Sequence, residues 1–172
     1  MTGPDVRIVH FDLATLEALV SADLSAARTL SGYVLPAMFT DRDWHGLWVM
    51  RRDQVRADPV AAGWVTGAIV EAGSEVPVGR AGFHGPPDAD GMVEVGYTVL
   101  VEHRRRGVAR AALQVMLDRA EADEGVRTVR ASISPGNVAS RSLVESAGFV
   151  EVGDQWDDED GLELVYERPS RS

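Results

Sequence analysis

The stretch from residue 92 to about residue 125 constrains the fold most, because three patterns follow one another there without a gap. Residues 92–101 alternate as a β-strand does, residues 102–110 form a loop rich in arginine, and apolar residues then recur at helical spacing. This order predicts a strand that runs through a short loop into a long helix. The first backbone N–H groups of such a helix have no partner within it, and the helix dipole favours an anion at that end.

The loop is positively charged in a chain that is strongly negative. The whole chain has a formal net charge of −10, with 17 basic and 27 acidic residues. The loop, in contrast, sets only Glu102 against four arginines: Arg104, Arg105, Arg106 and Arg110. Arginines at a helix N-terminus oppose the helix dipole, so a ligand anion, most simply a pyrophosphate, explains them best. The alternative is a basic helix start that only faces solvent.

The other segments predict one α/β (α+β) domain over residues 1–172. Their order is a strand, a helical region, three strands, a helix, a strand, a helix and two strands, which predicts a mixed sheet with helices packed on it. A ligand site is expected at the carboxyl ends of the strands in the strand–helix–strand unit. The expected strands are residues 6–11, 63–71, 76–84, 92–101, 126–133, 149–156 and 162–168, and the expected helical regions are 13–56, 107–125 and 137–147.

Composition excludes several classes of protein. All 17 basic residues are arginine, so the lysine that a P-loop nucleotidase needs is missing, and no GxGxxG run follows a strand. The negative charge disfavours nucleic acid. Without cysteine there is no disulfide, thiolate nucleophile or cysteine-ligated zinc, and the histidines lack metal-ligand spacing, so no metal is expected. With no signal sequence and no apolar run of ~20 residues, we expect a cytoplasmic protein away from membranes.

Three motifs, in this order, resemble the GNAT superfamily of N-acetyltransferases. Arg104-x-x-Gly107-x-Ala109 after a strand is similar to the family's acetyl-CoA pyrophosphate loop, Gln/Arg-x-x-Gly-x-Gly/Ala. Glu94-Val95-Gly96-Tyr97 precedes it, and Asn137-x-x-Ser140-x-x-Leu143 with Gly148-Phe149 follows it. Together they resemble the RimJ/RimL-like branch. The resemblance covers about residues 63–167 and implies the GNAT fold, a mostly antiparallel mixed sheet flanked by helices.

The resemblance also implies which residues hold acetyl-CoA. Val99 and Val101 correspond to the strand that offers backbone groups to the pantetheine arm, Asn137 to a second pantetheine contact, and Ser140 to a position near the thiol. Asn137 is equally placed to be a plain helix N-cap. The resemblance implies that the pyrophosphate is bound by the loop residues Arg104, Arg105, Arg106, Gly107, Val108, Ala109 and Arg110.

Glu94 and Ser140 are the candidate catalytic residues. Glu94 shares a strand face with Gly96 and Thr98, where the family often has a carboxylate, so we expect it to act as general base; a solvent-facing glutamate is the alternative. Many relatives have a tyrosine seven residues after the motif asparagine, to protonate the leaving thiolate. Here that residue is Val144. Ser140 instead matches the serine of the RimL-like branch, which implies that Ser140 either protonates the thiolate or orients the thioester.

Two further features remain open in the sequence. His84, at a strand end, faces the acceptor in one interpretation and is structural in the other. Trp156 lies beside an acidic run, residues 157–160, which attracts a cationic acceptor or simply forms a solvated hairpin tip. Trp44, Trp48 and Trp64 are expected in the core.

The resemblance implies an enzyme that moves an acetyl group from acetyl-CoA to a primary amine by direct attack in a ternary complex. The amine belongs to a protein N-terminus or a small molecule, and the helical segment, residues 13–56, is expected to form much of its wall. Since members often dimerise, a homodimer is one expected assembly. The alternatives are an enzyme that uses another acyl-CoA, a non-catalytic acyl-CoA sensor, and a plain phosphate-binding domain.

Overall fold

The computed structural model describes residues 3–171, which form one seven-stranded sheet in the order β1-β2-β3-β4-β5-β7-β6. Every described pair of neighbouring strands is antiparallel except β4 and β5, which run parallel on either side of a crossover helix. The expected mixed, mostly antiparallel sheet is therefore confirmed. The strands are β1 (Val6–Val9), β2 (Gly67–Glu71), β3 (Gly79–Phe83), β4 (Met92–Val99), β5 (Thr128–Ile133), β6 (Val150–Asp157) and β7 (Gly161–Pro169).

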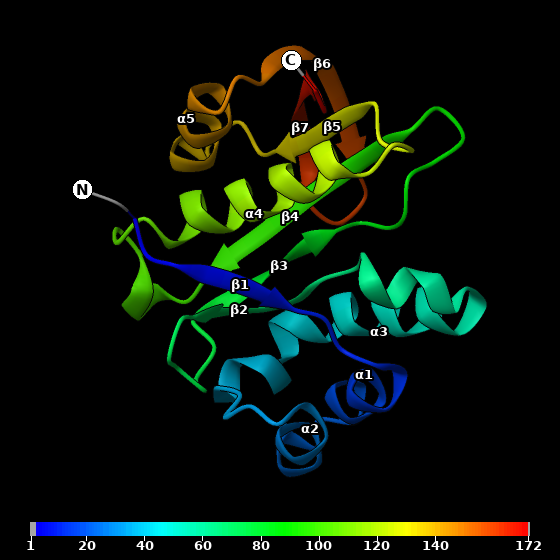
Figure 1. The fold of residues 1–172 in the computed structure, drawn as a ribbon, viewed down its shortest axis with the longest axis vertical. Coiled ribbons are helices and arrows are strands. Elements are labelled where there is room, and N and C mark those ends of the chain that lie inside the picture. Colours follow the sequence, from blue (N-terminus) through cyan, green and yellow to red (C-terminus); the bar gives the residue numbers. More distant parts are fainter. Residues whose placement is uncertain (1–2, 172) are drawn as a thin grey trace.

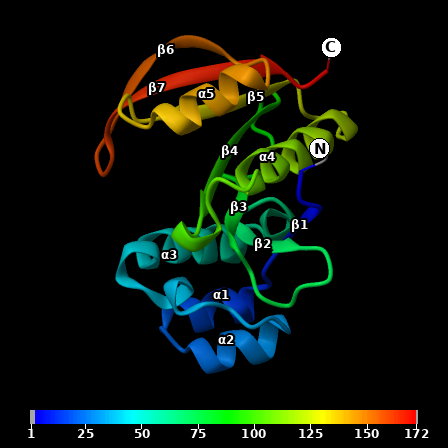
Figure 2. The ribbon, with the colours of Figure 1, turned by 90° about the vertical axis from the view of Figure 1, so that its left-hand side faces the viewer.

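The helices form two groups on opposite faces of the sheet (Figures 1 and 2). The first group precedes β2 in the chain and the second follows β4. The first comprises α1 (Leu13–Val20), α2 (Leu24–Ser31) and α3 (Arg42–Ala57), with the 3₁₀ turns η1 (Ala37–Thr40) and η2 (Pro59–Gly63); the second comprises the 3₁₀ turn η3 (Val101–His103), α4 (Val108–Ala122) and α5 (Val138–Ser146).

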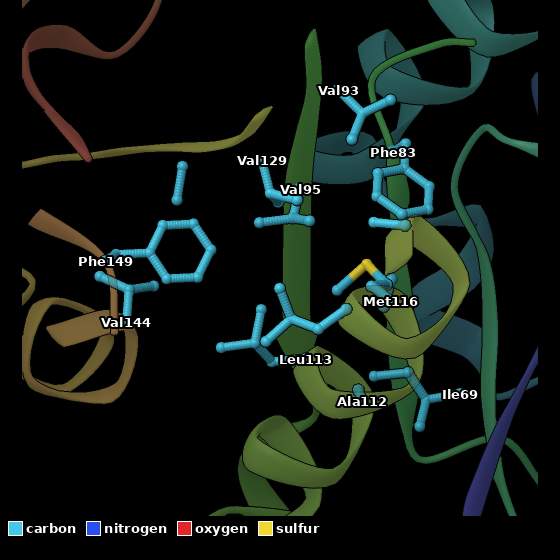
Figure 3. Packing of buried hydrophobic residues seen from close by; sticks show 14 of the residues in the cluster. Ile69, Phe83, Val93, Val95, Ala112, Leu113, Met116, Val129, Val144 and Phe149 are labelled. Carbon is cyan, nitrogen blue, oxygen red and sulfur yellow. The ribbon is translucent and has the colours of Figure 1, made fainter. Parts of the chain in front are cut away.

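Successive residues of a strand point to opposite faces of the sheet, and each face packs into its own hydrophobic core. Ile69 of β2 packs into the core on the α4 side, whereas its neighbours Ala68 and Val70 pack into the core on the α1–α3 side. Figure 3 shows Leu113 and Met116 pointing from α4 toward sheet residues in the first core. Trp44 and Trp48 lie in the second core and Trp64 in the first, so the expectation that the three tryptophans are core residues is confirmed.

The parallel strands β4 and β5 pair only at one end. Their register joins Met92–Glu94 to Thr128–Arg130, although β4 continues to Val99 and β5 to Ile133. Beyond Glu94 the two strands therefore separate. This opening lies at the carboxyl ends of the strands, where a ligand site is expected in such a unit.

Several expected boundaries were wrong in ways that have a physical cause. The fourth strand ends at Val99 rather than Val101. The N–H of His103 donates to the carbonyl oxygen of Leu100, and that of Arg104 to the carbonyl oxygen of Val101. These tight turns take the backbone out of hydrogen bonding with the neighbouring strand. The first strand ends at Val9 rather than Phe11, and the second begins at Gly67 rather than Gly63, because Gly63 is the last residue of η2. No helix formed by residues 3–171 has both the length and the apolar character that a membrane crossing requires.

Candidate functional site

A hollow of about 500 Å³ lies between the end of β4 and the N-termini of α4 and α5. We call it the first hollow. Most of the residues predicted to bind the cofactor line it: Val99, Arg104, Arg105, Gly107, Val108, Ala109, Arg110, Asn137 and Ser140. Sequence reasoning did not assign Tyr97, Thr98, His103, Ala139 and Leu143, which also line it.

The start of α4 offers unsatisfied donors to the first hollow. Gly107 precedes the helix with a left-handed backbone, φ +82°, and no side chain caps the helix. The N–H groups of the first turn therefore lack a capping partner and bear the positive end of the helix dipole. Arg105 also has a positive φ, 61°. This loop shape, with arginines around exposed N–H groups, suits an anion such as a pyrophosphate.

Two predicted cofactor residues lie outside the lining of the first hollow. Val101 belongs to η3 and is 72% exposed. The side chain of Arg106 donates to Glu71 Oε1 at 3.1 Å and approaches His103 Nδ1 at 2.9 Å, so it points toward β2. Arg104, in contrast, donates from Nε to the carbonyl oxygen of Val99 at 3.0 Å and braces the loop against β4.

Asn137 and Ser140 lie together at the start of α5. Asn137 Oδ1 accepts a hydrogen bond from Ser140 N at 3.2 Å, so the predicted N-cap is confirmed. The cap engages the amide oxygen, which leaves the amide N–H₂ as the end that can face a ligand. Gly148, with φ +87°, ends the helical region as expected.

A second hollow of about 720 Å³ opens on the other side of this point, between α3, the middle of β4 and the β6–β7 hairpin. Glu94 and His84 both line it, His84 Nδ1 lying 3.6 Å from Glu94 Oε2. Burial lowers the pKa of His84, Glu94 opposes this effect, and Arg51 and Arg80 lower the pKa further. His84 is therefore a neutral base near pH 7. The acidic run also reaches this hollow, since Asp157, Glu159 and Asp160 lie at its mouth.

The two hollows meet at a shared set of residues: Tyr97, Thr98, Asn137 and Ser140. The Tyr97 hydroxyl is buried there and has no hydrogen-bond partner within the described residues. Burial raises the pKa of Tyr97, and the nearby Ser140 hydroxyl partly offsets the rise. A buried phenol without a partner is costly in a folded chain unless a ligand supplies one. The sequence held a signal for it, because Tyr97 ends the Glu94-Val95-Gly96-Tyr97 motif.

Comparison with known proteins indicates the family of this chain. A family profile described as an acetyltransferase (GNAT) domain matches residues 6–150. An uncharacterized N-acetyltransferase, YjdG of Bacillus subtilis (strain 168), is 28% identical over 145 residues, which make up 84% of this chain and 86% of that protein.

Two solved structures share the fold. RimJ of Mycobacterium smegmatis, in complex with CoA-disulfide, has a TM-score of 0.62 at 19% identity and covers 96% of this chain and 88% of its own. The microcin C7 self-immunity acetyltransferase MccE, in complex with acetyl-CoA and AMP, has a TM-score of 0.65 at 12% identity and covers 96% of this chain and 92% of its own. The family profile spans most of the chain and the motifs fall in the hollows just described, and on these grounds the chain belongs to the GNAT family of acetyltransferases.

Proposed function

We propose that this chain transfers the acetyl group of acetyl-CoA to a primary amine by direct attack in a ternary complex. The meeting of the two hollows at Tyr97, Thr98, Asn137 and Ser140 carries the proposal. One hollow has the anion-binding loop that a CoA pyrophosphate needs, and the other has the base that an attacking amine needs. A chain without cysteine has no thiol for an acetyl-enzyme intermediate.

In this proposal the first hollow holds acetyl-CoA along the opening between β4 and β5. The N–H groups at the start of α4, with Arg104, Arg105 and Arg110, bind the pyrophosphate, while Arg106 stays paired with Glu71. The pantetheine lies along Val99, whose carbonyl keeps one lone pair beside its bond to Arg104, and reaches Asn137. Val101 follows in η3, just past the end of β4, and stays a predicted backbone contact of the pantetheine.

Glu94 and His84 act as the base in the second hollow. The acceptor amine must be neutral to attack, which costs about 4–5 kcal/mol at pH 7 for a lysine-like amine and about 1 kcal/mol for an α-amine. His84 accepts the proton directly or through water, and Glu94 stabilises the imidazolium that forms at 3.6 Å. Either residue alone can also accept the proton, so their variants separate the roles.

Tyr97, assisted by Ser140, is the proposed acid. The acetyl thioester supplies an electrophilic carbonyl and a thiolate leaving group. The amine forms the new C–N bond at the thioester carbonyl, and its surplus proton passes to the Glu94–His84 pair. The C–S bond then breaks, and the sulfur takes the proton of the Tyr97 hydroxyl. Water returns a proton to Tyr97 and takes the proton from the base. Because burial raises the pKa of Tyr97, the phenol holds its proton at neutral pH. Ser140, beside it, relays a proton or orients the thioester.

Residues 3–171 form one catalytic unit in this proposal. The segment containing α1–α3 (residues 13–56) supplies the acceptor wall through α3, and residues 63–167 supply the acetyl-CoA core. A protein N-terminus and a small-molecule amine both present the required group, and a homodimer stays a prediction.

Thermal unfolding tests cofactor binding. Acetyl-CoA at 100 times its Kd is expected to add about 2.7 kcal/mol to the free energy of unfolding. The rise in Tm should exceed the rises with ADP or pyrophosphate, because those ligands lack the arm that reaches Asn137. Equal shifts with pyrophosphate and acetyl-CoA would instead identify a plain phosphate-binding domain.

The pH profile tests the base. Because the pKa of His84 is lowered from 6.5, His84 is deprotonated and active down to a pH below 6.5 and is lost as base only when the pH falls through its lowered pKa. The acidic limb of kcat/KM is thus expected below pH 6.5, and His84→Gln should remove this limb and lower kcat by about 10- to 100-fold. A limb that persists unchanged in His84→Gln would assign it to another group.

A further inference from the structure

Two arginines lie at the floor of the second hollow. Both lower the pKa of His84, but the mechanism above gives neither of them a ligand. Arg51 comes from α3 and is only 3% exposed, although it lines the hollow. Arg80 comes from β3, and its Nε is buried without a hydrogen-bond partner within residues 3–171. Both side chains lie on the sheet face that α3 covers.

Within residues 3–171, no carboxylate lies at ion-pair distance from either guanidinium. The ion pairs among the described residues, counted to 4.0 Å, do not include Arg51 or Arg80. Glu94 is the acidic group that acts on Arg51, but at longer range, and it partly opposes the effect of burial on the pKa of Arg51. The pKa of each arginine is lowered to about 10, mainly by burial, and the charge of Arg51 contributes to the lowering for Arg80. Arginines this buried are normally paired, because an unpaired buried charge is strongly destabilising.

The surrounding protein fixes the direction of both side chains. Arg51 donates from Nε to Thr66 Oγ1 at 3.1 Å and from Nη1 to Gln54 Oε1 at 2.9 Å. The guanidinium of Arg80 lies over the Trp44 ring at 4.6 Å from its centroid. Neutral partners and an aromatic face hold the two forks without cancelling their charge, which is how a site for a ligand anion is built.

The arginine pair lies close to the place of reaction. Arg80 pairs in register with Thr98 of β4, and Thr98 lines both hollows. Neighbouring strands are only about 4.8 Å apart, and directly opposed residues point to the same face. Arg80 and Thr98 therefore face the same hollow, and an anionic group held by Arg80 shares that hollow with the amine that attacks the thioester.

We propose that the acceptor is an amine with a carboxylate a few bonds from its nitrogen, an α-amino acid being the simplest case, and that Arg51 and Arg80 bind this carboxylate. The inference rests on the proposed acetyl transfer and names its substrate class. A phosphate on the acceptor would use the same two forks. The exposed carboxylates at the mouth, Glu159 and Asp160, attract the ammonium of such a zwitterion before its anion reaches the floor.

Matched acceptor pairs test the substrate class. Thiol release from acetyl-CoA is measured with the twenty amino acids and their carboxamides, with phosphoethanolamine against ethanolamine, and with spermidine and a neutral peptide. The preferred carboxylate is expected to exceed its carboxamide by about 100-fold in kcat/KM, because the carboxamide leaves the arginines unpaired. If phosphoethanolamine shows the larger preference over its neutral partner, the anion is a phosphate.

Arg80→Met locates the anion site. Methionine keeps an apolar stem against Trp44 and removes the charge. At pH 8, where His84 is deprotonated in both proteins, the KM for the preferred anionic acceptor should rise about 30-fold. The KM for its neutral partner and the Kd for acetyl-CoA should change little. Arg7→Met is the matched control, because Arg7 also lies over an aromatic ring, that of Tyr33 at 5.8 Å, but on β1 and outside both hollows.

The outcomes separate the two proposals. If acetyl-CoA fails to bind, the proposed function falls first. If it binds but no compound in the panel releases thiol, the proposed acetyl transfer is wrong. If thiol is released but spermidine, the peptide or the carboxamides are the better acceptors, only the substrate class is wrong. Equal effects of Arg80→Met and Arg7→Met on the acceptor KM would also overturn the assignment of the anion to this pair.

Discussion

Glu94→Gln is expected to lower kcat by about 100- to 1,000-fold and to leave the Kd for acetyl-CoA unchanged. Glutamine keeps the size of the side chain but cannot accept a proton or stabilise a protonated His84, which lies 3.6 Å away. Glu94 lines only the second hollow, so its loss leaves the cofactor contacts in place. Steady-state thiol release and acetyl-CoA titration measure the two effects separately.

Glu124→Gln is the control, because Glu124 is exposed after the end of α4 and lines neither hollow. The pair of variants also distinguishes an enzyme from an acyl-CoA sensor. A sensor binds acetyl-CoA but releases no thiol with any amine in the native chain, so Glu94→Gln has nothing to lower. If the native chain turns over and Glu94→Gln matches it, Glu94 is not part of the base.

Gly107→Asp is expected to weaken acetyl-CoA binding by at least about 100-fold. Gly107 has φ +82°, which side-chain-bearing residues rarely adopt, and an added Cβ would lie 3.3 Å from Pro4 Cδ. The strain alone costs about 1–2 kcal/mol. The new carboxylate would also stand at the helix start where the pyrophosphate is proposed to bind, and repulsion between two anions is strong in a partly buried site. Isothermal titration measures the loss of affinity.

Gly73→Asp controls for strain and charge. Gly73 has φ +75° and nothing within 4 Å of an added Cβ, and it lies in the β2–β3 turn away from the first hollow. Both variants should lose similar stability in thermal unfolding, whereas Gly107→Asp alone should lose acetyl-CoA. If the Gly107→Asp protein folds and binds acetyl-CoA normally, the pyrophosphate does not bind at the start of α4.

Local signals in the sequence predicted the framework of the site well. The loop at residues 104–109 and the cap at Asn137 depend on neighbours within a few residues, so spacing alone carries the information. The hydrophobic period likewise predicted the element order, because each strand or helix buries one face. Boundaries such as Val99 were less certain, since the turn at residues 100–104 ends β4 through its own hydrogen bonds.

The sequence alone did not predict which residues form the floor of the second hollow. Arg51 shares the helical stripe of Trp44 and Trp48, which was visible in the sequence, but only the fold brings this stripe against Arg80 of β3 and Glu94 of β4. The position of the acidic hairpin tip at the mouth depends on the length and curvature of β6 and β7. Tertiary packing brings these three or four distant segments together, and local patterns in one sequence do not predict that packing.

The most direct test of the account places the acetyl group itself. The protein is mixed with a stable acetonyl analogue of acetyl-CoA that carries a ¹³C-labelled methyl group, and nuclear Overhauser contacts from that methyl are recorded. The account predicts contacts to the ring of Tyr97 and to Ser140, where the two hollows meet. A bound analogue whose methyl contacts neither residue would contradict it.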